Sequence, residues 1–217
     1  RLYDNTLADV NLLLWQAGGS RGLPSTTVSH CWTTTARPKA EYACELCEGE
    51  IPNAWISKLE SIQTRFVTTV LGLNANPAAV GGRMELSLDQ LGMRRKMLKL
   101  LFWKHLCDAD PSRLLSVIFR RRHAEARRGG AQHSWFQAMS ALMHDWGFDF
   151  SWRSGTAHGD WATCVRSVMS SRSARANLEA TQQRSSLSLY RKLGHVGIAP
   201  HLYSRHNPKG QWLKTSL

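Results

Sequence analysis

Residues 53–71 have the sequence NAWISKLESIQTRFVTTVL, the clearest helical pattern in the chain. Its apolar side chains are Trp55, Leu59, Ile62, Phe66 and Val70. A spacing of three or four positions places such residues on one face of an α-helix. Asn53 is a suitable N-cap, and Gly72 lies where a glycine commonly ends a helix. We therefore predict an amphipathic helix that buries one face.

Helical spacing continues through most of the chain, with no repeats and no convincing run of strands. We expect a capping box at Ser87-Leu88-Asp89-Gln90 and a second helix start at Asp110-Pro111. Residues 170–188 are rich in Ser, Arg and Gln and predict a mobile stretch. Further helices are expected at about 2–17, 23–35, 77–84, 87–107, 110–122, 135–146, 161–169, 187–193 and 200–206. The predicted fold is all-α, an irregular multi-helix array.

Two of these helices carry apolar residues that indicate their buried faces. In the helix at 87–107 a shared face holds Leu91, Leu98, Leu101 and Phe102. The helix that starts at Asp110-Pro111 carries Leu114, Leu115 and Ile118 and continues into three arginines. We expect most tryptophans on such stripes to be core residues. They are Trp55, Trp103, Trp135 and Trp146.

The charge of the chain is strongly uneven. It has 217 residues and a formal net charge of +12. Residues 1–90 hold 7 Lys/Arg against 9 Asp/Glu, whereas residues 91–217 hold 21 against 7. The first part is therefore suited to packing against protein and the second to facing phosphate. Nucleic acid is the expected polyanion, and no apolar run approaches the roughly 18 residues of a membrane span.

The basic residues of the second part gather in two clusters, one on each of the two helices after residue 87. Contacts to phosphate need only charge, reach and a shared surface. The alternative is a solvated face with cations near a helix C-terminus. The candidate nucleic-acid-binding residues are Arg94, Arg95, Lys96, Lys99, Lys104, Arg120, Arg121, Arg122, Arg127 and Arg128.

Metal and catalytic chemistry is not indicated. Polymerases need clustered aspartates for two metal ions, and the only close pair here is Asp108 and Asp110, which we interpret as helix-boundary residues. Cys44 and Cys47 form half of a zinc site whose best second half, His105 and Cys107, is distant in sequence. The histidines at 195, 201 and 206 have no nearby cysteine. We predict no catalytic residue, no metal ligand and no cofactor in this chain.

The five cysteines are odd in number and irregularly spaced. This pattern disfavours a secreted disulfide framework and predicts reduced thiols inside the cell. No secretory signal is recognisable at the start of the sequence, which has no initiator Met. We expect the chain to be a fragment of a larger protein.

Residues 38–120 resemble the region just after the palm in non-LTR (LINE-type) retrotransposon reverse transcriptases. The stretch at residues 38–45 is similar to the family's P-x-x-x-Y-G/A-x-E-x-W, and later motifs follow in the family's order. These are Pro38-Lys-Ala-Glu-Tyr42-Ala-Cys-Glu45, Lys58-Leu59, Ile62-Gln63, Arg65-Phe66, Leu71-Gly72-Leu73, Ala79-Val80, Glu85-Leu86, Leu88, Arg94-Arg95 and Leu101-Phe102-Trp103-Lys104. A fainter similarity covers Leu189-Tyr190-Arg191 and His201-Leu202-Tyr203.

The resemblance implies a place for the chain within a longer polyprotein. Residues 1–75 would form a thumb-like helical segment, 76–128 a basic helical linker and 129–217 a C-terminal helical segment. The palm carboxylates, with their Mg²⁺, would lie upstream, so the parent would be an RNA-directed DNA polymerase. The expected partners are RNA, DNA and that palm, with no membrane, in the nucleus. The rivals are a free-standing basic helical DNA/RNA-binding module and a degenerate transposon fragment.

Overall fold

The computed structural model describes residues 2–18, 23–46, 53–73, 79–129, 134–157 and 159–183. No strand occurs among them, which confirms the all-α prediction. These residues divide into two compact units. Unit 1 holds the described residues of 1–42, 54–91 and 172–183, and unit 2 those of 43–46, 53 and 92–171.

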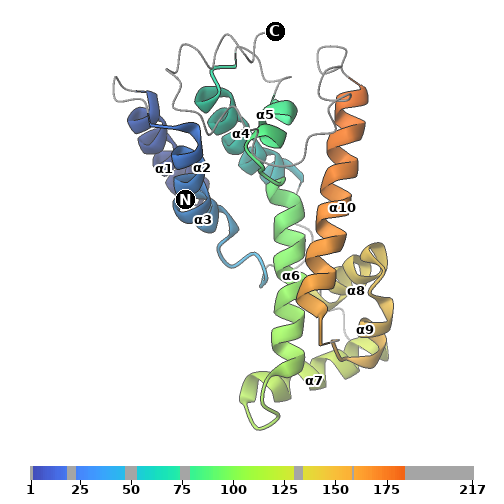
Figure 1. Ribbon diagram of the computed structural model, residues 1–217. Helices are drawn as coiled ribbons and strands as arrows, with labels where there is room; N and C mark the ends of the chain where they lie inside the picture. The colour runs from blue at the N-terminus through green and yellow to red at the C-terminus, as the bar shows by residue number, and fades with distance from the viewer. Residues whose placement is uncertain are drawn as a thin grey trace. The chain divides into compact units, whose positions relative to one another are not determined.

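Helices supply almost all the regular structure of both units (Figure 1). Unit 1 contains α1 to α5 and a π-helical turn, and unit 2 contains α7 to α9 with most of α6 and half of α10. The elements are α1 (Leu2–Gly18), α2 (Ser25–Cys31), η1 (Trp32–Ala36), α3 (Arg37–Glu41), α4 (Asn53–Val70), α5 (Ala79–Glu85), α6 (Leu91–Asp108), α7 (Leu114–Arg127), α8 (Ser134–Trp146), α9 (Asp149–Ser154) and α10 (Trp161–Gln182).

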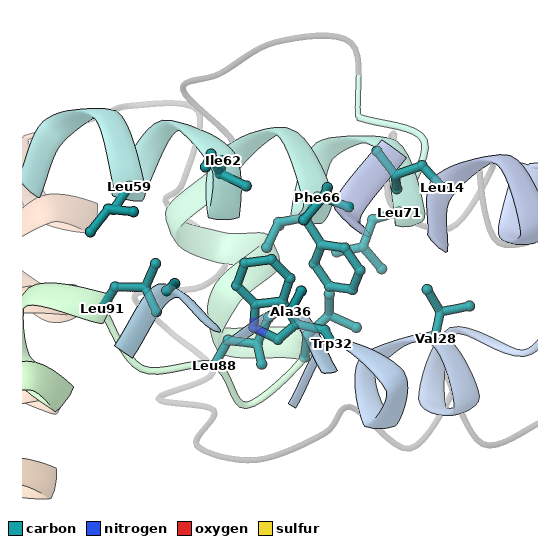
Figure 2. Packing of buried hydrophobic residues seen from close by; sticks show 14 residues of the cluster. Leu14, Val28, Trp32, Ala36, Leu59, Ile62, Phe66, Leu71, Leu88 and Leu91 are labelled. Carbon is teal, nitrogen blue, oxygen red and sulfur yellow. The ribbon is translucent and has the colours of Figure 1, made fainter. Parts of the chain in front are cut away.

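The core of unit 1 forms around the apolar face of α4 (Figure 2). Phe66 on α4 stacks on Trp32, with ring centroids 4.7 Å apart. Gln63 is fully buried and donates from Nε2 to the backbone oxygen of Asp89 at 2.9 Å. The predicted helix is confirmed, including its end at Gly72, whose φ is 65°. Burying this stripe is what fixes α4 in the unit.

Trp55 departs from this pattern. Its side chain is 44% exposed, so the prediction that it belongs to the core was wrong. The Nζ atom of Lys58, one turn further along α4, lies 5.5 Å from the centre of the Trp55 ring. This cation–π contact partly covers the ring, which lies in the first turn of α4, at the N-terminal end of the apolar stripe.

The segment before Pro38 is helical throughout, although a helix end was expected there. The π-helical turn η1 joins α2 to α3, and the N–H of Arg37 donates to the oxygen of Trp32, five residues earlier. A wider turn relieves the clash between a proline ring and the carbonyl four residues before it. Pro38 then occupies the first turn of α3, where its missing N–H leaves no gap.

The capping box expected at residue 87 does not form. Ser87 has a left-handed backbone with φ 54°, and α6 begins only at Leu91. The Asp89 side chain accepts a hydrogen bond from Ser173 Oγ at 3.1 Å, and its backbone oxygen accepts one from Gln63. Contacts within unit 1 therefore take the polar groups that local capping would have used.

The helix expected from Asp110 starts later. The Asp110 carboxylate accepts hydrogen bonds from the backbone N–H and the hydroxyl of Ser112, at 2.8 and 2.7 Å. The N–H of Arg113 also donates to the Asp110 oxygen at 3.0 Å, which closes a turn. Because aspartate bonds readily to a backbone two residues on, it initiates a turn here. Helix α7 follows from Leu114.

The core of unit 2 lies between α6, α7, α8 and α10. On α6 the residues buried in this core are Met97, Leu100, Trp103 and Leu106, spaced three apart. Of the predicted face, Leu91 is buried in the core of unit 1, but Leu98, Leu101 and Phe102 are only partly buried at the margin of the unit 2 core, so the prediction was wrong for these three. Helix α6 is apolar on several sides, so its sequence alone does not single out one face.

Helix α8 follows its prediction. Its buried residues are Phe136, Met139, Leu142, Met143 and Trp146. Gly147, with φ 81°, ends it at the expected position. Trp135, which was expected in the core, is only partly buried at its margin, and its indole N–H donates to the backbone oxygen of Glu45 at 2.7 Å.

Helix α10 extends through residues 170–182, where a mobile stretch was expected. Its side chains Ser173 and Thr181 are 4% and 1% exposed, and the Thr181 hydroxyl donates to the oxygen of Leu178 at 2.7 Å. Small side chains whose hydroxyls are satisfied can be buried in a helix, so a Ser-rich composition is no barrier. Residues 184–188 and the short helices expected at 187–193 and 200–206 lie outside the described residues.

Candidate nucleic-acid interface

Helix α7 carries the densest positive charge of unit 2. Residues 113–128 contain six arginines and one acidic residue, Glu125. Three side chains of the helix are buried, namely Ser116, Phe119 and His123. Since buried residues take one side of the helix only, the arginines project from the remaining surface.

His123 holds the buried side of α7 against the other helices of unit 2. Its Nε2 lies 2.8 Å from the backbone oxygen of Trp152. The rings of Trp103 and Trp152 meet the imidazole edge-on, with centroids 5.3 and 4.9 Å away, and Phe119 stacks parallel to it at 5.9 Å. Burial lowers the pKa of His123, against the opposing effect of the Trp152 carbonyl. The aromatic cage around the buried His123 therefore sets the rotation of α7.

With that rotation set, Arg120 and Arg127 lie on one side of α7, and the N-cap residue Arg113 precedes Arg120 by the same interval. Arg113, Arg120 and Arg127 are seven residues apart, which is about 20° short of two full turns and about 10 Å along the axis. All three are exposed. None forms an ion pair with another residue in the described part of the chain. We call these three residues the arginine row.

The other arginines of α7 differ in their surroundings. Arg121 Nε and Arg122 Nη1 lie 3.3 Å from the two oxygens of Glu125, so one carboxylate serves both. Arg128 is the exposed C-cap residue, and Gly129 follows it with φ 72°. Arg121 and Arg122 are thus partly neutralised, whereas Arg128 adds charge at the end of the helix.

The candidates on α6 are less available. Lys96 is exposed, but Lys104 Nζ lies 2.7 Å from a carboxylate oxygen of Asp108. Arg94 and Lys99 are half-buried. Arg95 is only 5% exposed, so the expectation that it contacts phosphate is not kept.

The residues that were weighed as metal ligands and set aside make other contacts. Asp108 pairs with Lys104, and the hydrogen bonds from Ser112 hold the pKa of Asp110 below its usual value. Burial, and then the charge of Asp108, raises the pKa of Cys107 to about 12. Within the described ranges no group of three His, Cys, Asp or Glu side chains could hold a metal ion.

The remaining candidates give no further site. Cys44 is buried, while Cys47 and the histidines at 195, 201 and 206 lie outside the described residues. Across the helices described here, none is both long and apolar enough to cross a membrane.

Sequence reasoning missed Arg113. It was not placed in a basic cluster because it stands alone between Ser112 and Leu114. The signal that could have found it is the seven-residue interval from Arg113 to Arg120 and from Arg120 to Arg127, which is close to two turns of a helix.

Searches against family models, curated proteins and solved structures returned no match to this chain.

Proposed function

We propose that unit 2 binds the phosphate backbone of nucleic acid, with the arginine row as the central contact. Arg128 and Lys96 are further exposed cations of unit 2 that extend the contact set. Each guanidinium offers a planar fork of donors that matches phosphate oxygens. Contacts of this kind hold a nucleic acid without reading its bases.

The position of Arg113 carries the proposal. Cations at the C-terminus of a helix are favoured by the helix dipole, which would account for Arg127 and Arg128 without any ligand. Arg113 is the N-cap residue of the same helix, where the dipole disfavours a positive charge. Its charge is nevertheless exposed at this end of the helix, seven residues before Arg120, so a shared anionic ligand along the helix explains the whole row better than capping does.

The wider role that we propose follows the resemblance to non-LTR retrotransposon reverse transcriptases. The chain would be a non-catalytic segment that helps to hold template and primer, or target DNA, during RNA-directed DNA synthesis in the nucleus. A palm elsewhere in the parent protein would supply the carboxylates and Mg²⁺. The basic, helical character of unit 2 supports such a role.

Fluorescence anisotropy on the whole chain tests the proposal. We expect the chain to bind both a DNA duplex and an RNA–DNA hybrid. Within each kind of nucleic acid, unrelated sequences should bind with similar affinity. Each neutralised phosphate contributes about −0.9 to the slope of log affinity against log salt, so three to five contacts predict a slope of roughly −3 to −4.5. Absence of binding at low salt would overturn the proposed function. A preference for the hybrid would support the role in reverse transcription over a general DNA-binding module.

A further inference from the structure

Helix α7 exposes an apolar patch on a side other than the arginine row. Leu114, Leu115, Val117 and Ile118 are 73%, 47%, 51% and 48% exposed. The opposite side of the helix buries Phe119 together with the polar Ser116 and His123. Four aliphatic side chains exposed to this degree present a few hundred Å², about the size at which a patch on a monomer marks an interaction site. We call these four residues the α7 patch.

Groups of opposite charge lie in the chain just before and just after the α7 patch, although the exposed Arg113 of the arginine row also lies at its first end. Asp110 lies in the turn just before the patch, and its carboxylate is oriented by Ser112. Arg121 and Arg122 lie one turn beyond the patch, beside Glu125. With 100° per residue, the centre of the patch is about 140° around the helix from Arg120, so the arginine row faces elsewhere.

We propose that the α7 patch binds the same patch of a second copy of this chain. A two-fold axis through the centre of the patch runs the two helices antiparallel and makes the contact self-complementary. It places the Asp110 end of each copy against the Arg121 and Arg122 end of the other. Burying both patches with their charged ends approaches the roughly 1,000 Å² that a specific interface requires.

The arrangement fits an anionic membrane surface less well. Helices that lie on a bilayer separate apolar and basic residues around the helix. On α7 Arg121 and Arg122 follow the patch along the axis on its own side, and Asp110 before the patch would be repelled by anionic lipid. A second copy satisfies both ends at once.

Sedimentation velocity of the whole chain over a series of concentrations, up to about 100 μM, tests the inference. We expect a concentration-dependent dimer that Leu115→Ser weakens at least about tenfold. Leu178→Ser is the matched control, because Leu178 is 45% exposed on α10, against 47% for Leu115. A chain that stays monomeric, or a dimer that Leu115→Ser leaves unchanged, overturns the inference. A monomer that binds anionic vesicles through Leu115 would replace it with a membrane contact.

A charge exchange tests the antiparallel arrangement itself. Asp110→Arg and Arg122→Glu should each be monomeric, because like charges then face one another at both ends of the contact. Mixing the two variants pairs Arg at 110 with Glu at 122, and Asp110 with Arg122, so a heterodimer should return. Its return also shows that both variants fold. Failure to recover on mixing, with both variants folded by circular dichroism, would contradict the antiparallel contact.

Discussion

Gly82 on α5 tests the packing of unit 1. A Cβ atom at this position would lie 2.5 Å from Val67 Cγ1, 3.0 Å from Leu71 Cδ1 and 3.1 Å from Leu73 Cδ1. Val67 is fully buried, and a β-branched side chain in a helix has essentially one rotamer, so it cannot rotate away. Gly82→Ala must therefore displace part of α4 or α5.

The expected magnitude combines two opposing effects. Overpacking in a core costs about 1–3 kcal/mol, and the better helix propensity of Ala returns about 1 kcal/mol. The net loss in the free energy of unfolding is then up to about 2 kcal/mol, which corresponds to a fall in Tm of up to roughly 8 °C for a chain of this size. Thermal and urea unfolding followed by circular dichroism measure it.

Two variants separate the clash from other effects. Gly159→Ala is the control, because a Cβ there meets nothing within 4 Å, and its stability should change by less than about 0.5 kcal/mol. In a Val67→Ala background the nearest obstacle to Gly82→Ala is gone, so the further loss should shrink to near zero. An equal cost of Gly82→Ala in both backgrounds would refute the packing described around Val67.

Two further substitutions test unit 2. The pKa of His123 is lowered in the folded chain, so the unfolded chain binds more protons, and stability should fall as pH drops through about 6.5. His123→Gln should flatten the dependence of Tm on pH and His144→Gln should not; equal profiles would contradict the cage. Trp161→Phe loses the 2.7 Å hydrogen bond to the oxygen of Leu100 and should cost about 1–3 kcal/mol. Trp55→Phe is its exposed control, and equal losses would contradict the burial of Trp161.

The sequence was sufficient for helices whose apolar face is unambiguous. On α4 and α8 a stripe of large apolar side chains repeats every three or four residues and ends just before a glycine, Gly72 or Gly147. The apolar spacing and the glycine therefore indicate the same helix end. Helix starts were predicted less well, because the side chains of Asp and Ser form hydrogen bonds equally well within a local turn and with a distant partner. Asp110 closes a local turn with Ser112, whereas Asp89 binds the distant Ser173, and the sequence alone does not show which of the two an aspartate will do.

In the candidate site, too, some features could be predicted from the sequence and others could not. Spacing of four residues already indicates the pairs Lys104–Asp108 and Arg121–Glu125, so their partial neutralisation could have been predicted. The burial of Arg95 and the exposure of Leu115 could not, because both depend on which side of a helix the core selects. On α7 that choice is made by the cage around His123, whose rings come from four separate helices.

Whether the arginine row binds phosphate is most directly tested by the salt dependence of duplex binding. Replacing Arg113, Arg120 and Arg127 with Ala removes three contacts and should flatten the log–log slope by about 2–3. The control replaces Arg65, Arg166 and Arg175, which are exposed on α4 and α10, and so removes the same net charge from elsewhere.

Our account predicts that this control keeps nearly the parent slope, while the row variant loses affinity equally for unrelated sequences. If the row variant keeps the parent slope, or if both variants lose the same amount, the row is only a solvated face of α7. The proposed interface would then be contradicted.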